Sequence, residues 1–205
     1  MKLWYSNTSP YARKVRAVAA HHGLDAQIEA SLISVSSFSD QAEHNRDNPL
    51  GKIPVLQISD GTWLYSSNVI AEYLDAQGGS RTLYPQGTQR WAALNLHDLA
   101  AGLLDNSIAV IAEKLLRPEA EWWLARHGQI RQRNARTLSV LAEALRPFGT
   151  ELNIGTLNAV CAIDFLRFRN ALTAAESMAG FAGLAAWADE MNARHPCLAA
   201  TKPFA

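Results

Sequence analysis

The spacing of apolar residues changes character once along the chain, near residue 80. Before that point short strand-like runs alternate with helical segments, and after it the apolar stripes recur at helical spacing. The expected order in the first part is strand, helix, strand, helix, strand, strand, helix. This order predicts an α/β domain followed by an all-helical region. The expected strands are 3–5, 26–32, 54–58 and 63–65, and the expected helices are 10–22, a short one within 36–48, and one that begins after residues 66–67.

The segment from Gly78 to Gly87 (GGSRTLYPQG) is rich in glycine and turn residues. Such a composition between two differently patterned regions is typical of a linker. We therefore expect a first domain over residues 1–78, a linker over 79–86 and a helical domain over 87–205.

Helix signals divide the second part. Pro118 suits the first turn of a helix, because its missing N–H has no intrahelical partner there. Asn153 is a favourable N-cap residue, and Pro196 predicts that the preceding helix has ended. The expected helices run from 89 to 116, from 118 to about 145, from 153 to 168, and around 184–191.

Composition excludes several classes of function. The 205 residues carry 19 basic and 19 acidic side chains, which gives no electrostatic case for a nucleic-acid or acidic-membrane partner. No apolar run approaches the ~20 residues of a membrane span, and the N-terminus lacks a signal-peptide core. Cys161 and Cys197 suggest no disulfide framework, and no metal-ligand cluster is visible. We expect a cytoplasmic protein without a metal.

The first motif is Ser9-Pro10, at the start of the helix that follows the first strand. Serine is a favoured N-cap and proline is favoured next to it, so simple capping explains the pair. However, a hydroxyl, free N–H groups and the charges of Arg13, Lys14 and Arg16 converge at this helix start. Such a place suits an anion, and a thiolate is one candidate. The serine hydroxyl would stabilise it by donating a hydrogen bond.

The second motif is Gly51-Lys52-Ile53-Pro54-Val55. Proline is tolerated at the first position of a strand, so a plain loop-to-strand turn is one interpretation. A cis Ile53–Pro54 bond is the other, in which the backbone N–H and C=O of Ile53 face outward. These groups could pair with an extended peptide ligand, and Lys52 could meet a carboxylate.

The third motif is Tyr65-Ser66-Ser67-Asn68, which leads into the last helix of the first part. It reads either as an N-cap alone or as a carboxylate site made of the free N–H groups at the helix start. In the second interpretation Ser67 adds a hydroxyl donor.

The order and spacing of SPYARKVR, NPLGKIPVL and YSSNVIAEYLD, followed by a helical second half, resemble the glutathione S-transferase family. The resemblance covers essentially the whole chain, and CAIDFLRFR and RHPCLAATKP also look like family signatures. It is closest to bacterial members with a serine at the thiol site.

The resemblance implies a thioredoxin-like, glutathione-binding N-terminal domain, a C-terminal helical bundle and a homodimer. It gives Ser9 the thiolate-stabilising role and Lys52 the contact with the glycyl carboxylate. Ile53, before Pro54, would pair through its backbone with the cysteinyl unit. Ser67 would hold the γ-glutamyl carboxylate.

Two positions depart from the family pattern. Ser66 stands where relatives usually carry an acid for the γ-glutamyl ammonium, and losing that charge predicts about fivefold weaker glutathione binding. The run from Asn153 to Thr156 replaces a Ser/Thr-x-x-Asp cap, which affects stability more than activity. Thr8, Tyr11 and Arg13 lie near the thiol site and are secondary candidates for contact with glutathione.

The function expected from these motifs is a glutathione transferase of the detoxification type, which activates the thiolate for attack on a small hydrophobic electrophile. One alternative is a glutathione-dependent isomerase, peroxidase or etherase that shares the thiolate site. Another is a non-catalytic ligand-binding or regulatory protein on the same fold, an interpretation that Ser66 favours. Tyr5 is an alternative thiol partner that we rank below Ser9.

Overall fold

Two compact units make up the computed structural model, which describes residues 1–33, 42–79, 82–173 and 181–203. One unit contains residues 1–84 together with 196–205, and the other contains residues 85–195. The sequence-based division assigned all of residues 87–205 to the second domain. Residues 196–205 group with the first unit instead, because their short helix packs on the first helix of the chain. Residues 80–81 of the expected linker lie outside the described ranges.

From β1 to α3 the first unit has the predicted order of strands and helices, and α10 is an element that was not predicted. Residues 25–27 form a 3₁₀ turn, so the second strand begins at Glu29, later than expected. Residues 36–41 of the expected second helix lie outside the described ranges. The elements are β1 (Lys2–Tyr5), α1 (Pro10–His22), η1 (Asp25–Gln27), β2 (Glu29–Leu32), α2 (Ala42–Asp47), β3 (Val55–Gln57), β4 (Trp63–Tyr65), α3 (Ser67–Gln77) and α10 (Pro196–Ala199).

The four strands form one sheet in the order β2-β1-β3-β4. Strand β1 is parallel to β2, whereas β3 is antiparallel to both β1 and β4. Strands β1 and β4 therefore run in the same direction, and β3 runs in the opposite one. The end of β1, the end of β4 and the start of β3 consequently lie at the same edge of the sheet.

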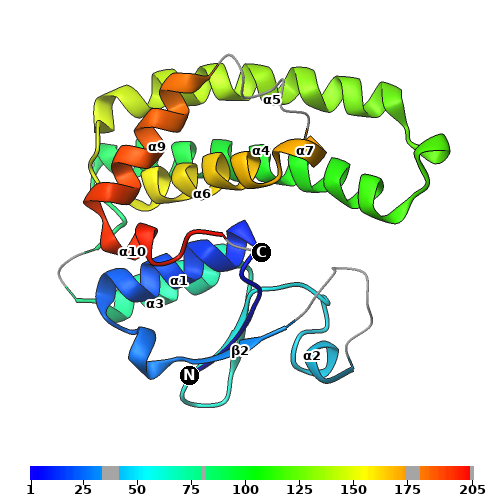
Figure 1. The fold of residues 1–205 in the computed structure, drawn as a ribbon. Helices are drawn as coiled ribbons and strands as arrows, with labels where there is room; N and C mark the ends of the chain where they lie inside the picture. The colour runs from blue at the N-terminus through cyan, green and yellow to red at the C-terminus, as the bar shows by residue number, and fades with distance from the viewer. Residues whose placement is uncertain (34–41, 80–81, 174–180, 204–205) are drawn as a thin grey trace. The chain divides into compact units, whose positions relative to one another are not determined.

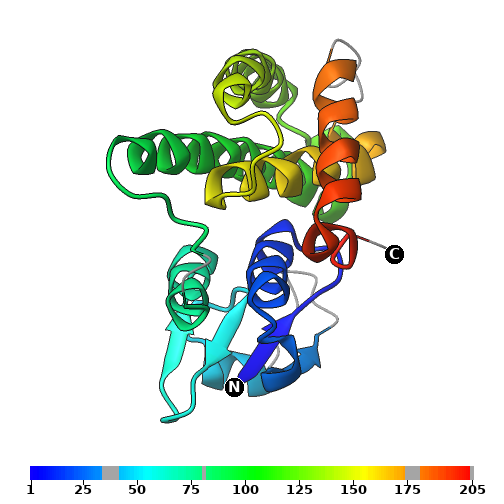
Figure 2. The same cartoon turned by 90° about the vertical axis from the view of Figure 1, so that its left-hand side faces the viewer.

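Helices α1 and α3 pack together on one face of this sheet (Figures 1 and 2). They bury Val15 and Val18 from α1 and Ile70 and Leu74 from α3. A second buried cluster contains Trp4, Ile33 and Val55. The sheet is thus supported by apolar packing close to the edge where the three motifs lie.

In the described part of the second unit every regular element is a helix. Helix α6 is the buried element, and it packs against both α4 and α9. The elements are α4 (Thr88–Leu116), η2 (Glu119–Glu121), α5 (Leu124–Leu145), η3 (Arg146–Phe148), α6 (Ile154–Phe168), α7 (Asn170–Thr173) and α9 (Ala182–Arg194).

The buried helix α6 starts with a complete capping box. The side-chain oxygen of Asn153 accepts the N–H groups of Gly155 and Thr156 at 2.9 and 3.0 Å. The Thr156 hydroxyl accepts the N–H of Asn153 at 2.9 Å. Both side chains are buried, so a neutral pair satisfies the helix start without a carboxylate.

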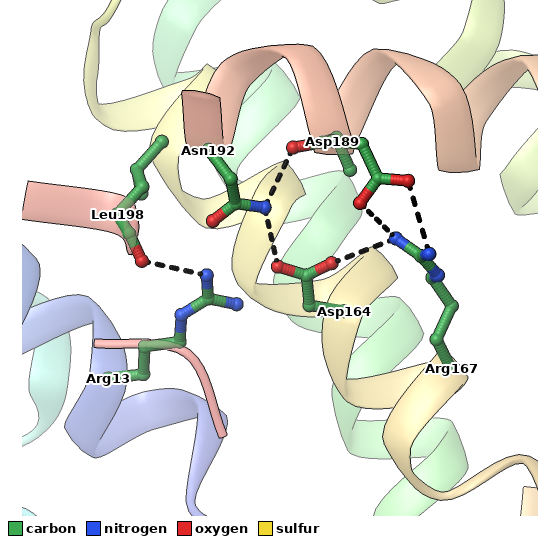
Figure 3. Close-up of polar contacts among 7 residues, drawn as sticks. Arg13, Asp164, Arg167, Asp189, Asn192 and Leu198 are labelled. Carbon is green, nitrogen blue, oxygen red and sulfur yellow. Dashed lines mark hydrogen bonds and ion pairs between the residues drawn. The ribbon is translucent and has the colours of Figure 1, made fainter. Parts of the chain in front are cut away.

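A polar network joins α6 to α9 (Figure 3). The buried Asp164 carboxylate accepts from the Asn192 amide at 2.9 Å and from Arg167 at 3.4 Å. Arg167 also forms a two-pronged pair with Asp189, at 2.8 and 3.2 Å, and these hydrogen bonds raise the pKa of its guanidinium. The one acid in this buried part of α6 is therefore hydrogen-bonded to a cation and to an amide.

Helices α4 and α6 approach closely at Gly155. A Cβ atom built on Gly155 would lie 2.4 Å from the backbone oxygen of Ala93 and 3.1 Å from the Cβ of Leu96. The glycine is required here by the close approach of another backbone.

We predict that Gly155→Ala lowers the free energy of unfolding by about 1–3 kcal/mol, because α4 or α6 must shift to admit the methyl group. Urea denaturation measures the change. The matched control is Gly128→Ala in α5, where a Cβ meets nothing within 4 Å. That control should gain roughly 0.5–1 kcal/mol from helix propensity. Equal effects at the two positions would contradict the close-approach argument.

The connection from α4 to α5 differs from the prediction that Pro118 opens a helix. Pro118 has an extended backbone, with φ −54° and ψ 145°, and the helix begins six residues later, at Leu124. Glu113 of α4 explains the delay, since its carboxylate accepts the N–H of Trp123 at 2.8 Å and contacts His127 Nε2 at 2.8 Å. The Trp123 N–H and then His127 hold the pKa of Glu113 below its ordinary value of 4.5.

We predict that the stabilising effect of Glu113 depends on pH. A lowered pKa in the folded state means that the contribution is present above pH 4.5 and is lost as pH falls through the folded-state value. The difference in melting temperature between wild type and Glu113→Gln should therefore be largest near neutral pH and shrink in acid. Glu119→Gln, which alters the exposed turn beside it, is the control. A difference that stays constant with pH would contradict the prediction.

Candidate functional site

Strand direction brings the three sequence motifs to one edge of the sheet. Ser9 follows the end of β1, Pro54 precedes the start of β3, and Ser66 follows the end of β4. The pairing of Trp4 with Val55, and of Val55 with Tyr65, aligns these three points. Motifs that are well separated in sequence, at Ser9, Pro54 and Ser66, thus line one edge of the first unit.

Ser9 is the N-cap of α1, as predicted. Its backbone is extended, with φ −77° and ψ 121°, and its hydroxyl oxygen accepts the N–H of Ala12 at 3.2 Å. Pro10 occupies the first helical position. Because capping uses only a lone pair of the hydroxyl, the Ser9 proton is available for donation to an anion at the start of α1.

The Ile53–Pro54 peptide bond is cis, so the second motif is not a plain loop-to-strand turn with a trans proline. Within the described ranges, neither the N–H nor the C=O of Ile53 makes a hydrogen bond. The Lys52 side chain is exposed. The loop thus offers one backbone donor, one backbone acceptor and a cation, the groups needed to bind an extended peptide with a carboxylate end.

Two residues that the sequence analysis did not single out hold this loop. The amide of Asn48 and the Nε2 of His44 both hydrogen-bond to the carbonyl oxygen of Lys52. Both side chains are buried. The sequence carried part of the signal, because the Asn48-Pro49 dipeptide with Gly51 after it is typical of a turn. Nothing local indicated that His44 reaches the same carbonyl.

Ser66 caps α3 in an unusual backbone conformation. Its φ of 68° with ψ of 127° is a combination that favours glycine, and holding a serine there costs on the order of 1–3 kcal/mol. The exposed hydroxyl of Ser66 accepts the N–H of Asn68 at 3.3 Å, and Ser67 is buried at the first helical position. Strain retained at a surface position is a pointer to a functional role.

The electrostatics at the start of α3 favour a negative ligand. The first turn of α3 contains no acidic residue. The ammonium of Lys14, a fully buried residue of α1, donates to the side-chain oxygen of Asn68. Helix dipole, cation and hydroxyls all suit a carboxylate, whereas no carboxylate is present in this turn to receive an ammonium.

The secondary candidates lie in different surroundings. Thr8 and Tyr11 flank Ser9 and are half-buried. Arg13 is only 2% exposed, and its guanidinium donates to the carbonyl of Leu198 in α10 at 3.3 Å (Figure 3). Arg13 therefore connects α1 to the C-terminal segment of its own unit.

The described part of the chain contains neither a metal-binding group of side chains nor a membrane-spanning helix. Its residues include no group of three histidine, cysteine or acidic side chains that could hold a metal ion. In the same residues no helix is long and apolar enough to cross a membrane.

The first unit has a thioredoxin-like sheet with a cis proline before β3, and a helical region follows it along the chain. Residues 8–77 match the model for the family described as glutathione S-transferase, N-terminal domain. A similar solved structure, a glutathione transferase family member from Pseudomonas fluorescens Pf-5 with bound glutathione, is 34% identical. It superposes with a TM-score of 0.92 over 100% of this chain and 99% of that one. The chain belongs to the glutathione S-transferase family.

Curated relatives agree with this assignment. The uncharacterized GST-like protein YibF of Escherichia coli K12 is 28% identical over 180 residues, which span 82% of this chain and 83% of that protein. Maleylacetoacetate isomerase of Pseudomonas aeruginosa is 37% identical over 93 residues, 42% of this chain and 38% of the isomerase. The family thus includes a protein named for a different reaction.

Proposed function

We propose that the protein is a glutathione transferase with Ser9 as its catalytic residue. The observation that carries the proposal is the meeting of the α1 start, the Ile53 backbone and the α3 start at one sheet edge. The glutathione bound in the similar Pseudomonas fluorescens structure supports the ligand. A homodimer and a cytoplasmic location belong to the same proposal, as the family resemblance implies.

Each part of glutathione has a matching group in this proposal. Lys52 meets the glycyl carboxylate, and the free N–H and C=O of Ile53, next to the cis Pro54, pair with the cysteinyl backbone. Ser67 and the first N–H groups of α3 hold the γ-glutamyl carboxylate. Ser66 offers a neutral hydroxyl to the ammonium.

The chemistry depends on the sulfur. A thiol has a pKa of about 8.5, and a helix N-terminus together with a hydroxyl donor lowers it. The thiol proton leaves to solvent, and the thiolate accepts a hydrogen bond from Ser9 Oγ. The sulfur lone pair then forms a bond to an electrophilic carbon, and the leaving group departs with its electrons.

The isomerase relative motivates a second candidate. Its 37% identity extends over 42% of this chain. In that reaction class the same thiolate would add to a carbon–carbon double bond, allow rotation about it and then leave. Assays with an aryl halide and with a cis-alkene dicarboxylate, each in the presence of glutathione, distinguish transfer from isomerisation. A protein that binds glutathione and turns over neither class would favour the non-catalytic alternative.

We predict that Ser9→Ala lowers kcat for conjugation by about 10²-fold, the typical cost of removing one donor to a reacting anion. The pKa of the bound thiol, measured from thiolate absorbance, should rise by roughly 1–2 units. Asn153→Ala is the control, because it removes a helix cap in the other unit at a cost of about 1 kcal/mol. A normal kcat in folded Ser9→Ala would refute the assigned role.

We predict that Ser66→Glu tightens glutathione binding about fivefold, because an ammonium–carboxylate hydrogen bond replaces a neutral one. Calorimetric titration measures the dissociation constant. The control Ser66→Gln has the same length without the charge and should gain less. Equal affinities for wild type and Ser66→Glu would show that this position does not contact the ammonium.

A further inference from the structure

We propose that Asn48 and His44 are positioning residues that aim the Ile53 backbone at glutathione. The inference rests on the proposed function, since it concerns the same ligand. In this proposal neither Asn48 nor His44 contacts glutathione directly. They act through the carbonyl group of Lys52, which accepts a hydrogen bond from each of their side chains.

Asn48 organises the loop with both ends of its amide. The side-chain oxygen accepts the N–H of Leu50 at 3.0 Å, and the side-chain nitrogen donates to the carbonyl of Lys52. The backbone carbonyl of Asn48 accepts the N–H of Gly51 at 3.0 Å, and Gly51 has a φ of 61°. Asn48 is 1% exposed, so water does not compete for these bonds.

His44 approaches the same carbonyl from α2. Its Nε2 lies 3.2 Å from the Lys52 oxygen, and because a carbonyl only accepts, Nε2 must carry the proton. The His44 ring packs edge-on against the Trp4 ring, with 6.0 Å between the two ring centroids. The Trp4 indole N–H donates to the Asp47 carboxylate at 2.9 Å. These contacts fix α2 to strand β1.

Peptide geometry carries the effect to the ligand. The carbonyl of Lys52 and the N–H of Ile53 belong to one planar peptide group, and in a trans peptide they point in opposite directions. The only cis bond among the described residues is Ile53–Pro54, so the Lys52–Ile53 bond is trans. Two buried donors that hold the carbonyl inward therefore hold the Ile53 N–H outward. That N–H is the donor we assign to the cysteinyl unit of glutathione.

The predicted signature is a change in binding without a change in thiolate chemistry, because Ser9 is on a different element. Asn48→Asp keeps the oxygen that accepts from Leu50 but replaces the donor to Lys52 by a second acceptor. We expect KM and Kd for glutathione to rise about tenfold, the size of one lost hydrogen bond to an oriented group. We expect kcat at saturating glutathione to stay within about twofold, with the pKa of the bound thiol unchanged.

A pair of His44 variants separates positioning from mere packing. His44→Gln retains an amide donor that can reach the Lys52 carbonyl, whereas His44→Leu fills similar space without a donor. Glutathione affinity should fall about tenfold in His44→Leu and stay close to wild type in His44→Gln. Circular dichroism and thermal unfolding identify variants that fold, and the His44 pair decides the question if Asn48→Asp does not fold.

Asn158→Ala is the matched control. Asn158 is also a buried asparagine whose amide donates to a backbone carbonyl, that of His97 at 2.8 Å, but it lies in the second unit. The Asn158→Ala variant should be less stable than wild type and should bind glutathione with the wild-type Kd. The inference is overturned if folded Asn48→Asp and His44→Leu bind glutathione like wild type, or if His44→Gln loses as much affinity as His44→Leu. Wild type that fails to bind glutathione would instead remove the proposed function, and this inference with it.

Discussion

Every helix leaves backbone N–H groups unpaired at its start, and these groups need hydrogen-bond acceptors. How this chain supplies the acceptors determines both its helix caps and its candidate site. Among the described residues, side chains cap the starts of α1 (Ser9), α3 (Ser66) and α6 (Asn153). In the buried α6 the cap has to satisfy the donors fully, and Thr156 completes it. At α1 and α3 only part of the donor capacity is used, and the remainder is what makes the first unit suitable for an anionic peptide.

Topology converts these separate helix starts into one site. Because β1 and β4 run in the same direction and β3 runs against them, the starts of α1 and α3 lie beside the loop that enters β3. That loop contributes backbone groups rather than a reactive side chain. The orientation of these backbone groups therefore depends on neighbours such as Asn48, whose amide holds the carbonyl of Lys52.

The sequence alone predicted the order of strands and helices from β1 to α3 and the Ser9 cap, because both depend on local preferences. It offered the cis Ile53–Pro54 bond only as one of two interpretations. It was wrong about Pro118, where local preference favours a helix start and the contact from Glu113 delays the helix to Leu124. It also missed His44, whose partner carbonyl is fixed by the packing of α2 on Trp4. Errors of this kind arise where side chains distant in sequence determine the local backbone. The individual roles of the glutathione-site residues remain predictions.

The contact between Arg13 and the Leu198 carbonyl has a consequence for the order of assembly during synthesis. The first unit is discontinuous in sequence, since residues 196–205 complete it after the whole of residues 85–195 has been made. A nascent chain that has emerged only as far as Tyr84 lacks α10, and its Arg13 guanidinium has no Leu198 carbonyl to meet. The first unit therefore reaches its final packing only after residues 85–195 have been translated, although residues 1–84 are made before them.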